Sequence, residues 1–399
     1  MFKKLQLASA LMLAISTTAF GADAPGVTAT EIKIGGVFPF SGPASSIGVV
    51  GKGLLAYVQS MNDRGGINGR KINYIAYDDA YSPPKSVEHI RKLVESDDVA
   101  FIFGQLGTPG VSATAKLLMS RGIPDIAVIT GSAKFTEVAS YPALTTGLVS
   151  YDVEGKIYAK YLKKVLPNAK YAILYQNDDL GKDYVKAFKS YFKDDFDKKV
   201  TAAAYEITDP TVDSQVVNLK STGAEALLVA GTPKFSAQAI RKAAEIGWKP
   251  TLIVNFPSSS VSSTLKPAGF DKSVGVIVGS IVKDPTDSRW NDDAGMKGYR
   301  AFFEKYIPGG DIGDTNYLTG YQQGLVLEQI LKQCGSDLSR ENIIKQAKSL
   351  KGVTLPTSMP GITISTSDTV NQLWTQMQLQ RWTGESWEQF GDVLDGTSD

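Results

Sequence analysis

The sequence contains very few of the side chains that most enzymes and metal sites use. Its 399 residues include one histidine, His89, and one cysteine, Cys334. Serine and cysteine hydrolases need a histidine beside the nucleophile, and the common zinc sites need several histidines or cysteines, so both classes are excluded. One cysteine also excludes an intramolecular disulfide. A hydrolase that uses only carboxylates, or a calcium site, stays open. Cys334 falls in an expected helix, residues 317–335, which predicts a small buried side chain.

Charge of one sign and long hydrophobic runs are also scarce. The chain carries 42 basic and 41 acidic residues, and this balance argues against nucleic acid as a partner. An apolar segment follows Lys3 and Lys4, with Ala19 and Gly21 at the small-residue positions of a cleavage site. This pattern predicts a signal peptide over residues 1–21 and export of the rest. No later stretch approaches the roughly 18 consecutive apolar residues of a membrane helix.

Apolar strands alternate with amphipathic helices along the chain. One β-α-β-α-β series ends at the strand 126–129, and a second series occupies residues 152–256. Alternation of this kind predicts parallel sheets with right-handed crossovers, so we expect an α/β fold with two doubly wound, Rossmann-like lobes. Helices at 293–306, 317–335 and 340–350 are expected to return to the first lobe, and residues 372–393 to form an antiparallel hairpin. Residues 133–149 follow no regular pattern.

The stretch FIFGQLGTPGVS, residues 101–112, is the most informative for function. A buried strand is expected to end at Gly104, and Thr108-Pro109 is a helix-start signal. Open α/β sheets bind ligands, and anions in particular, where a strand's carboxyl end meets a helix N-terminus. Thr108 is therefore either a ligand-binding residue or only the cap of its helix.

Three other patterns carry little functional weight. The run GVVGKG, residues 48–53, lacks the spacing of a phosphate-binding loop and falls inside an expected helix. No GxGxxG motif follows the first strand, so nothing specific points to a dinucleotide. The acid pairs at 78–79, 178–179 and 292–293 lie at strand ends or helix starts, which favours helix capping over catalysis or calcium binding.

Several motifs together resemble a known family. The runs IKIGGVFPFSGPASSIG, GGINGRK followed by YDDA, and YAILYQNDDLGKDYVKAF are similar to the periplasmic leucine/isoleucine/valine-type substrate-binding proteins of ABC transporters. LGTP, TDPTVDSQ and KDPTD resemble a branch often associated with aromatic or other hydrophobic carboxylates. The resemblance implies the type I periplasmic binding protein fold, with two lobes joined by three crossovers that close on a ligand. Its expected lobes are residues 27–148 with 283–359, and residues 149–282 with 360–399.

The resemblance also implies candidate ligand-binding residues. Thr108 matches the hydroxyl residue that holds a ligand carboxylate, and Thr130, Gly131 and Ser132 match the loop that completes the carboxylate site. Ile47, Leu180 and Thr232 stand where amino acid binders carry aromatic residues. Tyr151, Asn255 and Ser258 are further cleft candidates. The family's first-lobe cysteine pair is replaced by Tyr81 and Gly107.

The region that supplies an acid to the ligand ammonium in amino acid binders reads NFPSSS, residues 255–260, and contains no acid. A buried ammonium without a carboxylate is costly, so an α-amino acid is disfavoured unless Asp152 or Glu154 supplies the charge. We therefore expect a non-enzymatic, cofactor-free, monomeric periplasmic protein that delivers a small organic carboxylate with an apolar, possibly aromatic body to an ABC permease and its ATPase subunits. The alternatives are branched-chain amino acid binding, a sensor of the same fold, and an enzyme that uses the acid pairs.

Overall fold

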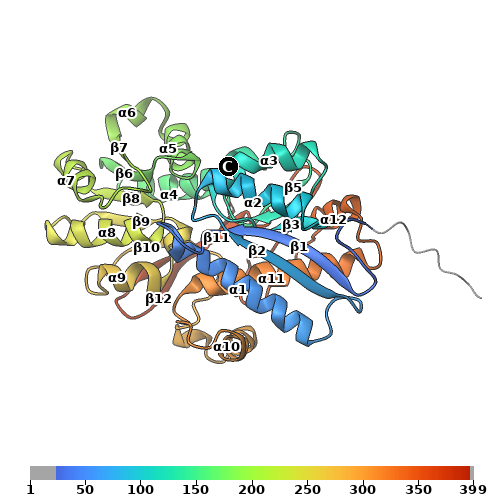
Figure 1. Cartoon of the computed structure of the whole chain (residues 1–399). Helices are drawn as coiled ribbons and strands as arrows, with labels where there is room; N and C mark the ends of the chain where they lie inside the picture. The colour runs from blue at the N-terminus through green and yellow to red at the C-terminus, as the bar shows by residue number, and fades with distance from the viewer. Residues whose placement is uncertain (1–23, 396–399) are drawn as a thin grey trace, which may run out of the picture.

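The computed structural model describes residues 24–395, which form two α/β lobes side by side (Figure 1). The predicted signal peptide, residues 1–21, lies outside the described residues. Blue, teal and orange segments of Figure 1 make up the first lobe, and green and yellow segments most of the second. Chain segments far apart in sequence thus build each lobe.

The first lobe has a five-stranded parallel sheet in the order β2-β1-β3-β4-β5. Its order reverses beside β1, which is the doubly wound arrangement expected from the sequence. The sequence pattern missed β5, because three residues are too few to show a strand period. The strands are β1 (Glu31–Phe38), β2 (Lys71–Asp78), β3 (Phe101–Phe103), β4 (Asp125–Val128) and β5 (Leu144–Thr146).

The second lobe has a seven-stranded sheet in the order β12-β11-β10-β9-β8-β6-β7. Its pairs are parallel except at β10–β11 and β11–β12, which confirms the expected antiparallel hairpin. The strands are β6 (Tyr171–Gln176), β7 (Val200–Tyr205), β8 (Ala226–Ala230), β9 (Thr251–Val254), β10 (Ile277–Ser280), β11 (Gln376–Trp382) and β12 (Trp387–Asp395).

Helices cover the sheets, and the late helices return to the first lobe as expected, since α11 packs along α1 and α10 also contacts α1. In the second lobe α4 packs on α5 and α7 on α8. The longer helices are α1 (Ser45–Asp63), α2 (Pro83–Glu95), α3 (Thr108–Ser120), α4 (Tyr151–Val165), α5 (Asp179–Phe192), α7 (Asp213–Ser221), α8 (Pro233–Glu245), α10 (Ala294–Tyr306), α11 (Thr315–Cys334) and α12 (Arg340–Ala347). The short ones are η1 (Ala133–Thr136), η2 (Lys193–Asp195), α6 (Phe196–Lys199), η3 (Phe256–Ser258), η4 (Val261–Leu265), α9 (Lys266–Ala268) and η5 (Ser288–Trp290).

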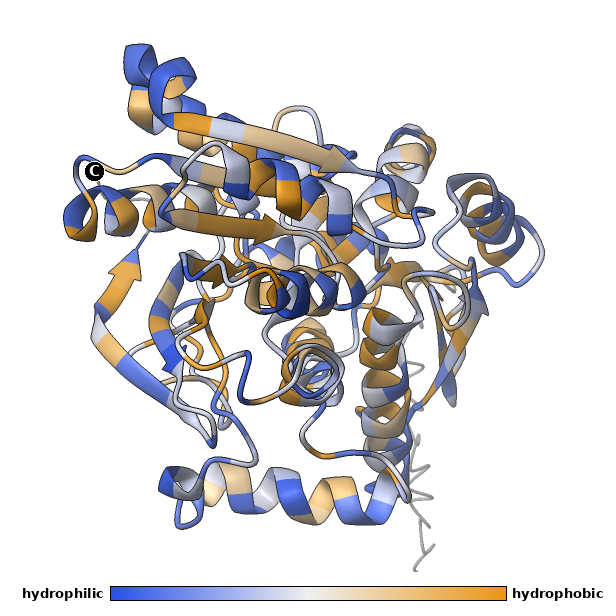
Figure 2. Cartoon of the chain, turned by 90° about the vertical axis from the view of Figure 1, so that its left-hand side faces the viewer, coloured by the Kyte–Doolittle hydropathy of each residue, from blue (hydrophilic) through white to orange (hydrophobic). Residues whose placement is uncertain are grey.

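Hydrophobic residues gather on the strands and on the helix sides that face them (Figure 2). The strands β3, β4 and β8 are buried along their whole length, as parallel strands covered on both faces should be. Within residues 24–395 no helix combines the length and the hydropathy needed to cross a bilayer.

The run GVVGKG lies inside α1, as predicted, and its glycines serve packing. A Cβ on Gly53 would collide with the Tyr317 backbone of α11, and one on Gly320 would collide with the Val50 backbone of α1. Small residues at this contact therefore let the two helices approach closely, which fixes both helix starts beside the cleft.

The segment between the expected boundary at residue 360 and β11 contacts the first lobe. Residues 364–373 hydrogen-bond with the first lobe, because Ile364 pairs with Val353 and Gln372 pairs with Thr146 beside β5. The chain enters the second sheet only at β11. Residues of this segment therefore lie against the first lobe, and the expected division of the chain into lobes stays a prediction.

Candidate functional site

A cavity of about 550 Å³, counting the part open to solvent, lies between the two lobes. Its walls include residues from the loops that follow β3, β4 and β5 in the first lobe and β6, β8 and β9 in the second. Ligands of doubly wound sheets bind at such carboxyl ends of strands. The starts of α1 and α11 complete the walls.

Side chains from the two lobes bond to each other around this cavity. The Ser132 hydroxyl donates to Asp183 at 2.9 Å, and Lys134 forms an ion pair with Asp179 at 2.5 Å. Beside α11 the Ser260 hydroxyl donates to Asp314 at 2.9 Å. These contacts tie the two lobes to each other beside the cavity.

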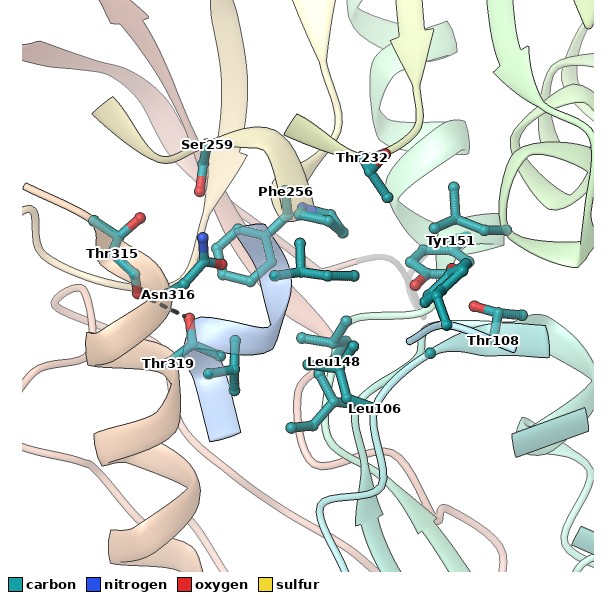
Figure 3. Close-up of a pocket in the computed structure, with 17 residues that line it drawn as sticks. Leu106, Thr108, Leu148, Tyr151, Thr232, Phe256, Ser259, Thr315, Asn316 and Thr319 are labelled. Carbon is teal, nitrogen blue, oxygen red and sulfur yellow. Dashed lines mark hydrogen bonds between the residues drawn. The ribbon is translucent and has the colours of Figure 1, made fainter. Parts of the chain in front are cut away.

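The centre of the cavity is apolar. Figure 3 shows Leu106 and Leu148 from the first lobe below Phe256 from the second, with polar side chains to either side. The apolar lining residues are Ile47, Val50, Leu106, Ile129, Leu148, Leu180, Phe256 and Pro257. No charged side chain lines the cavity within the described part of the chain.

Thr108, Thr130 and Tyr151 form a cluster of hydroxyls that we call the anchor end. The Thr108 and Thr130 hydroxyl oxygens are 2.8 Å apart, and both residues are buried. Gly107, with φ of 112°, is the N-cap of α3, and no side-chain hydrogen bond caps this helix. The interpretation of Thr108 as a helix cap is therefore wrong: it is the first helical residue, and its hydroxyl turns to Thr130 beside the cavity.

Tyr151 joins the anchor end from the second lobe as the first residue of α4. Burial raises the pKa of Tyr151 to about 12, although hydrogen bonds with the Gly131 backbone and the Thr108 and Thr130 hydroxyls favour the phenolate. The tyrosine is therefore a neutral O–H group at neutral pH. Its proton is available to an acceptor. Thr108 and Thr130 bond to each other, so one of these two hydroxyls donates to the other.

Thr232 lies on the same side of the cavity as Tyr151 and Thr108 (Figure 3). It precedes α8, lines the cavity, and its buried hydroxyl has no partner within the described chain. Leu180, the second residue of α5, lines the cavity nearby. Helices α3, α5 and α8 thus begin at the cavity, and helix N-termini favour anions.

Gly131 has no room for a side chain. A Cβ there would press on the Val149 carbonyl oxygen and lie 2.7 Å from the Tyr151 ring. Gly131, which the sequence predicted as a site residue, therefore supports the anchor end by letting Tyr151 approach the loop. It does not itself line the cavity.

We expect Gly131→Ala to destabilise the fold by about 1–3 kcal/mol, the usual cost of overpacking, and to weaken ligand binding by moving Tyr151. Gly298→Ala, in open space on α10, is the matched control and should be neutral or slightly stabilising. Denaturant unfolding and ligand titration measure both effects. Equal behaviour of the two variants would contradict the packing argument.

The remaining predicted residues lie behind the cavity wall. Ser132 donates to Asp183, and the Ser258 hydroxyl donates to the Gly231 carbonyl at 3.0 Å. Asn255 is fully buried, with its oxygen accepting from the Gly231 N–H at 3.3 Å. The structure therefore brings Ile47, Thr108, Tyr151, Leu180 and Thr232 to the cavity, and Thr130, Gly131, Ser132, Asn255 and Ser258 to the layer behind it.

The acids considered as ammonium partners do not reach the cavity. Glu154 is buried and accepts hydrogen bonds from the Tyr158 and Tyr184 hydroxyls, each at 2.6 Å, and from the Phe256 N–H at 2.7 Å. Asp152 pairs with Lys156 on the surface side of α4. Asp178 caps α5 by accepting from the Leu180 N–H, which confirms the capping interpretation of that acid. Asp293 likewise caps α10.

The far end of the cavity carries Ser259, Thr315, Asn316 and Thr319 (Figure 3). We call these four residues the distal end. Sequence reasoning singled out the NFPSSS run that contains Ser259, but it missed the three residues of α11. No local signal identifies them, because they reach the cavity through the packing of α11 on α1, far along the chain.

Two smaller expectations concern Tyr81, Gly107 and Cys334. A Cβ on Gly107 would lie 2.9 Å from the Tyr81 ring, so packing joins the two positions at which the family resemblance implied a cysteine pair. Cys334 is buried, as predicted, and burial raises the pKa of its thiol to about 12. In the described residues no group of three histidine, cysteine, aspartate or glutamate side chains is arranged to hold a metal ion.

Comparisons with known proteins identify the family. Residues 31–386 match the family described as periplasmic binding protein. The chain is 26% identical over 352 residues to the Leu/Ile/Val-binding protein homolog 7 of Brucella abortus (strain 2308), and the match covers 85% of both chains. Among solved structures it resembles a branched-chain amino acid ABC transporter protein from Thermus thermophilus with bound valine (14% identity, TM-score 0.82, coverage 92% of this chain and 97% of that one). It also resembles an R. palustris ABC transporter solute-binding protein in complex with 4-hydroxybenzoate (18% identity, TM-score 0.75, coverage 92% and 97%). The fold, the interlobe cavity and the matched length agree: this chain belongs to the periplasmic binding protein family.

Proposed function

We propose that this chain is the exported ligand-binding component of an ABC importer and that its ligand is a small organic carboxylate with an apolar body, such as an aromatic ring. The observation that carries the proposal is the lining of the cavity, which combines an apolar centre with the hydroxyl-rich anchor end and, among residues 24–395, contains no charged side chain. Neutral donors and helix N-termini can hold a carboxylate without a cation. An ammonium in the same place would have no carboxylate to pair with.

The anchor end supports carboxylate binding in a second way. Within the described chain Thr232 keeps a buried hydroxyl without a partner, and Thr108 and Tyr151 add two more hydroxyls to the lining, with Thr130 bonded to Thr108 behind them. A buried polar group without a partner is costly, so a ligand oxygen that accepts from Thr232 removes a penalty that the unliganded protein carries. The apolar centre then takes the body of the ligand through burial of its surface.

A branched-chain amino acid is the second candidate, because the curated relative named above is called a Leu/Ile/Val-binding protein homolog. This ligand would require an acid at the cavity, and the acids behind its walls, Glu154, Asp178 and Asp314, already accept hydrogen bonds from donors of the protein. Delivery to a membrane permease with ATPase subunits, and a monomeric state in the periplasm, follow from the same proposal.

Thermal unfolding with a ligand panel tests the proposal. We expect benzoate, 3-phenylpropanoate or octanoate to stabilise the protein by about 2.7 kcal/mol at 100 times the Kd of the acid that binds. The matching carboxamide of that acid is the control, and it should stabilise far less because it carries no negative charge. Stabilisation by leucine and valine, with no effect of the aromatic and fatty acids, would instead establish the second candidate.

A further inference from the structure

We propose that the distal end is a subsite for a neutral hydrogen-bond donor, so that the apolar body of the ligand ends in a hydroxyl group opposite its carboxylate. This inference rests on the proposed function and refines the class of ligand. It is carried by the side-chain amide of Asn316, which lines the cavity and is more than nine-tenths buried.

The orientation of this amide is set by its surroundings. The Asn316 nitrogen donates to Asp314 at 2.8 Å, to the Ser46 carbonyl at 3.3 Å and to the Ser263 hydroxyl at 3.4 Å. Because carbonyl and carboxylate oxygens are acceptors only, the NH2 group must face them, and the amide oxygen must face the other way. Figure 3 shows this oxygen turned toward Phe256 at the cavity centre.

The Asn316 oxygen is therefore an acceptor that the protein leaves open. Among residues 24–395 no donor forms a hydrogen bond with it. Its natural partner is an O–H or N–H group of a ligand, since a buried acceptor without a partner costs free energy. A ligand that ends in a methyl group would bury this oxygen unpaired.

Neighbouring hydroxyls favour a ligand hydroxyl in particular. The Thr319 hydroxyl donates its hydrogen bond to the Thr315 carbonyl at 3.2 Å, so the Thr319 hydroxyl oxygen is a second acceptor at the cavity. Ser259 lines the cavity beside Asn316 and can donate. A ligand hydroxyl can donate to Asn316 or Thr319 and accept from Ser259 at once.

A second carboxylate is excluded at this end. Asp314 lies directly behind Asn316, is largely buried, and also accepts from the Ser260 hydroxyl and the Asn316 backbone N–H. A ligand carboxylate there would meet a like charge and an amide oxygen, neither of which can donate to it. The two ends of the cavity therefore differ in chemistry, and this difference fixes the orientation of the bound ligand.

Calorimetric titration of matched ligands tests the subsite. Each set contains three carboxylic acids with the same body, which is benzoate, 3-phenylpropanoate or octanoate. The three members carry hydrogen, hydroxyl or methoxy at the far end. In the set that binds best we expect the hydroxyl member to bind roughly 10-fold tighter than the parent, within the 5- to 100-fold range of a buried hydrogen bond. The methoxy member, which accepts but does not donate, should gain nothing.

Variants connect the preference to Asn316. Asn316→Ala should bring the ratio of the two Kd values close to one, and Thr319→Val should reduce it in part. Asn342→Ala is the matched control, because Asn342 also donates through its amide to backbone carbonyls but lies outside the cavity. It should keep the wild-type ratio. The ratio of the two Kd values stays informative even if a variant weakens the closure of the lobes, because weaker closure affects both ligands equally.

The outcomes separate this inference from the proposed function. Equal Kd values for parent and hydroxyl members, a gain for the methoxy member, or a ratio that survives Asn316→Ala overturns the distal donor subsite while carboxylate binding stands. If no acid of any set binds, both the proposed function and this inference fail.

Discussion

Replacing Thr108 with valine is expected to raise the Kd of a bound carboxylate by roughly 5- to 150-fold. The substitution keeps the shape of the side chain and removes one hydroxyl from the anchor end, where it lies 2.8 Å from the Thr130 hydroxyl. Leaving a buried acceptor without its hydrogen-bond partner costs about 1–3 kcal/mol, which gives this range of Kd. Calorimetric titration with the acid that binds measures the change.

Thr114→Val is the matched control for this experiment. Thr114 is a buried threonine two turns further along α3, and its hydroxyl bonds to Gln105 and the Gly110 carbonyl without lining the cavity. This variant should lose some stability but keep the wild-type Kd. If both variants bind the acid as tightly as the wild type, Thr108 holds its loop and not the ligand.

Glu154→Gln is expected to remove a pH dependence of about 3 kcal/mol from the free energy of unfolding. Burial raises the pKa of Glu154 from its usual 4.5 to about 7, against hydrogen bonds from Tyr158, Tyr184 and the Phe256 backbone that lower it. Between pH 4.5 and 7 the folded state thus keeps a proton that the unfolded state releases. The wild type should lose stability as the pH rises through this window, and the rise in pKa from 4.5 to about 7 corresponds to about 3 kcal/mol.

The glutamine variant should be nearly independent of pH in the same window, apart from groups that both proteins share. One such group is Asp178, whose pKa burial raises to about 6, and it cancels in the difference between the two proteins. Asp152→Asn is the control: Asp152 is a partly exposed carboxylate two residues before Glu154 in the same helix turn, and this variant should follow the wild type within about 1 kcal/mol. Denaturant unfolding from pH 4 to 8 gives the curves. If the difference in unfolding free energy between the wild type and Glu154→Gln did not change with pH, Glu154 would be ionised throughout this window.

The fold was largely predictable because each element carries its own signal. Buried strands such as β8 are short apolar runs, and helices such as α8 begin at a proline after a capping position, so local patterns identify them without knowledge of their neighbours. The pattern failed where the structure is decided by distant partners. The three-residue strand β5 and the pairing of Gln372 with Thr146 depend on contacts across the first lobe.

The site was predictable on one side only, for the same reason. Thr108, Thr232 and Leu180 follow strand ends, where a doubly wound sheet gathers its ligand contacts, so sequence reasoning could assign them to one cleft. Asn316 and Thr319 reach the cavity only because α11 lies along α1, and no spacing rule predicts which turn of a distant helix faces a cleft. The chemistry of the distal end therefore required the structure.

The buried position of Cys334 has a practical consequence. It is the only thiol in the chain, it lies in the core beneath α12, and burial raises its pKa to about 12, so it reacts poorly with maleimides. A cysteine introduced at an exposed site can thus carry a single fluorophore without removal of the native one. Placed at the rim of the cleft, the dye would report ligand binding, provided that the ion pair of Lys134 and Asp179 between the lobes is left intact. Because its single native thiol reacts poorly, the protein suits labelling with one dye as an optical sensor of its own ligand.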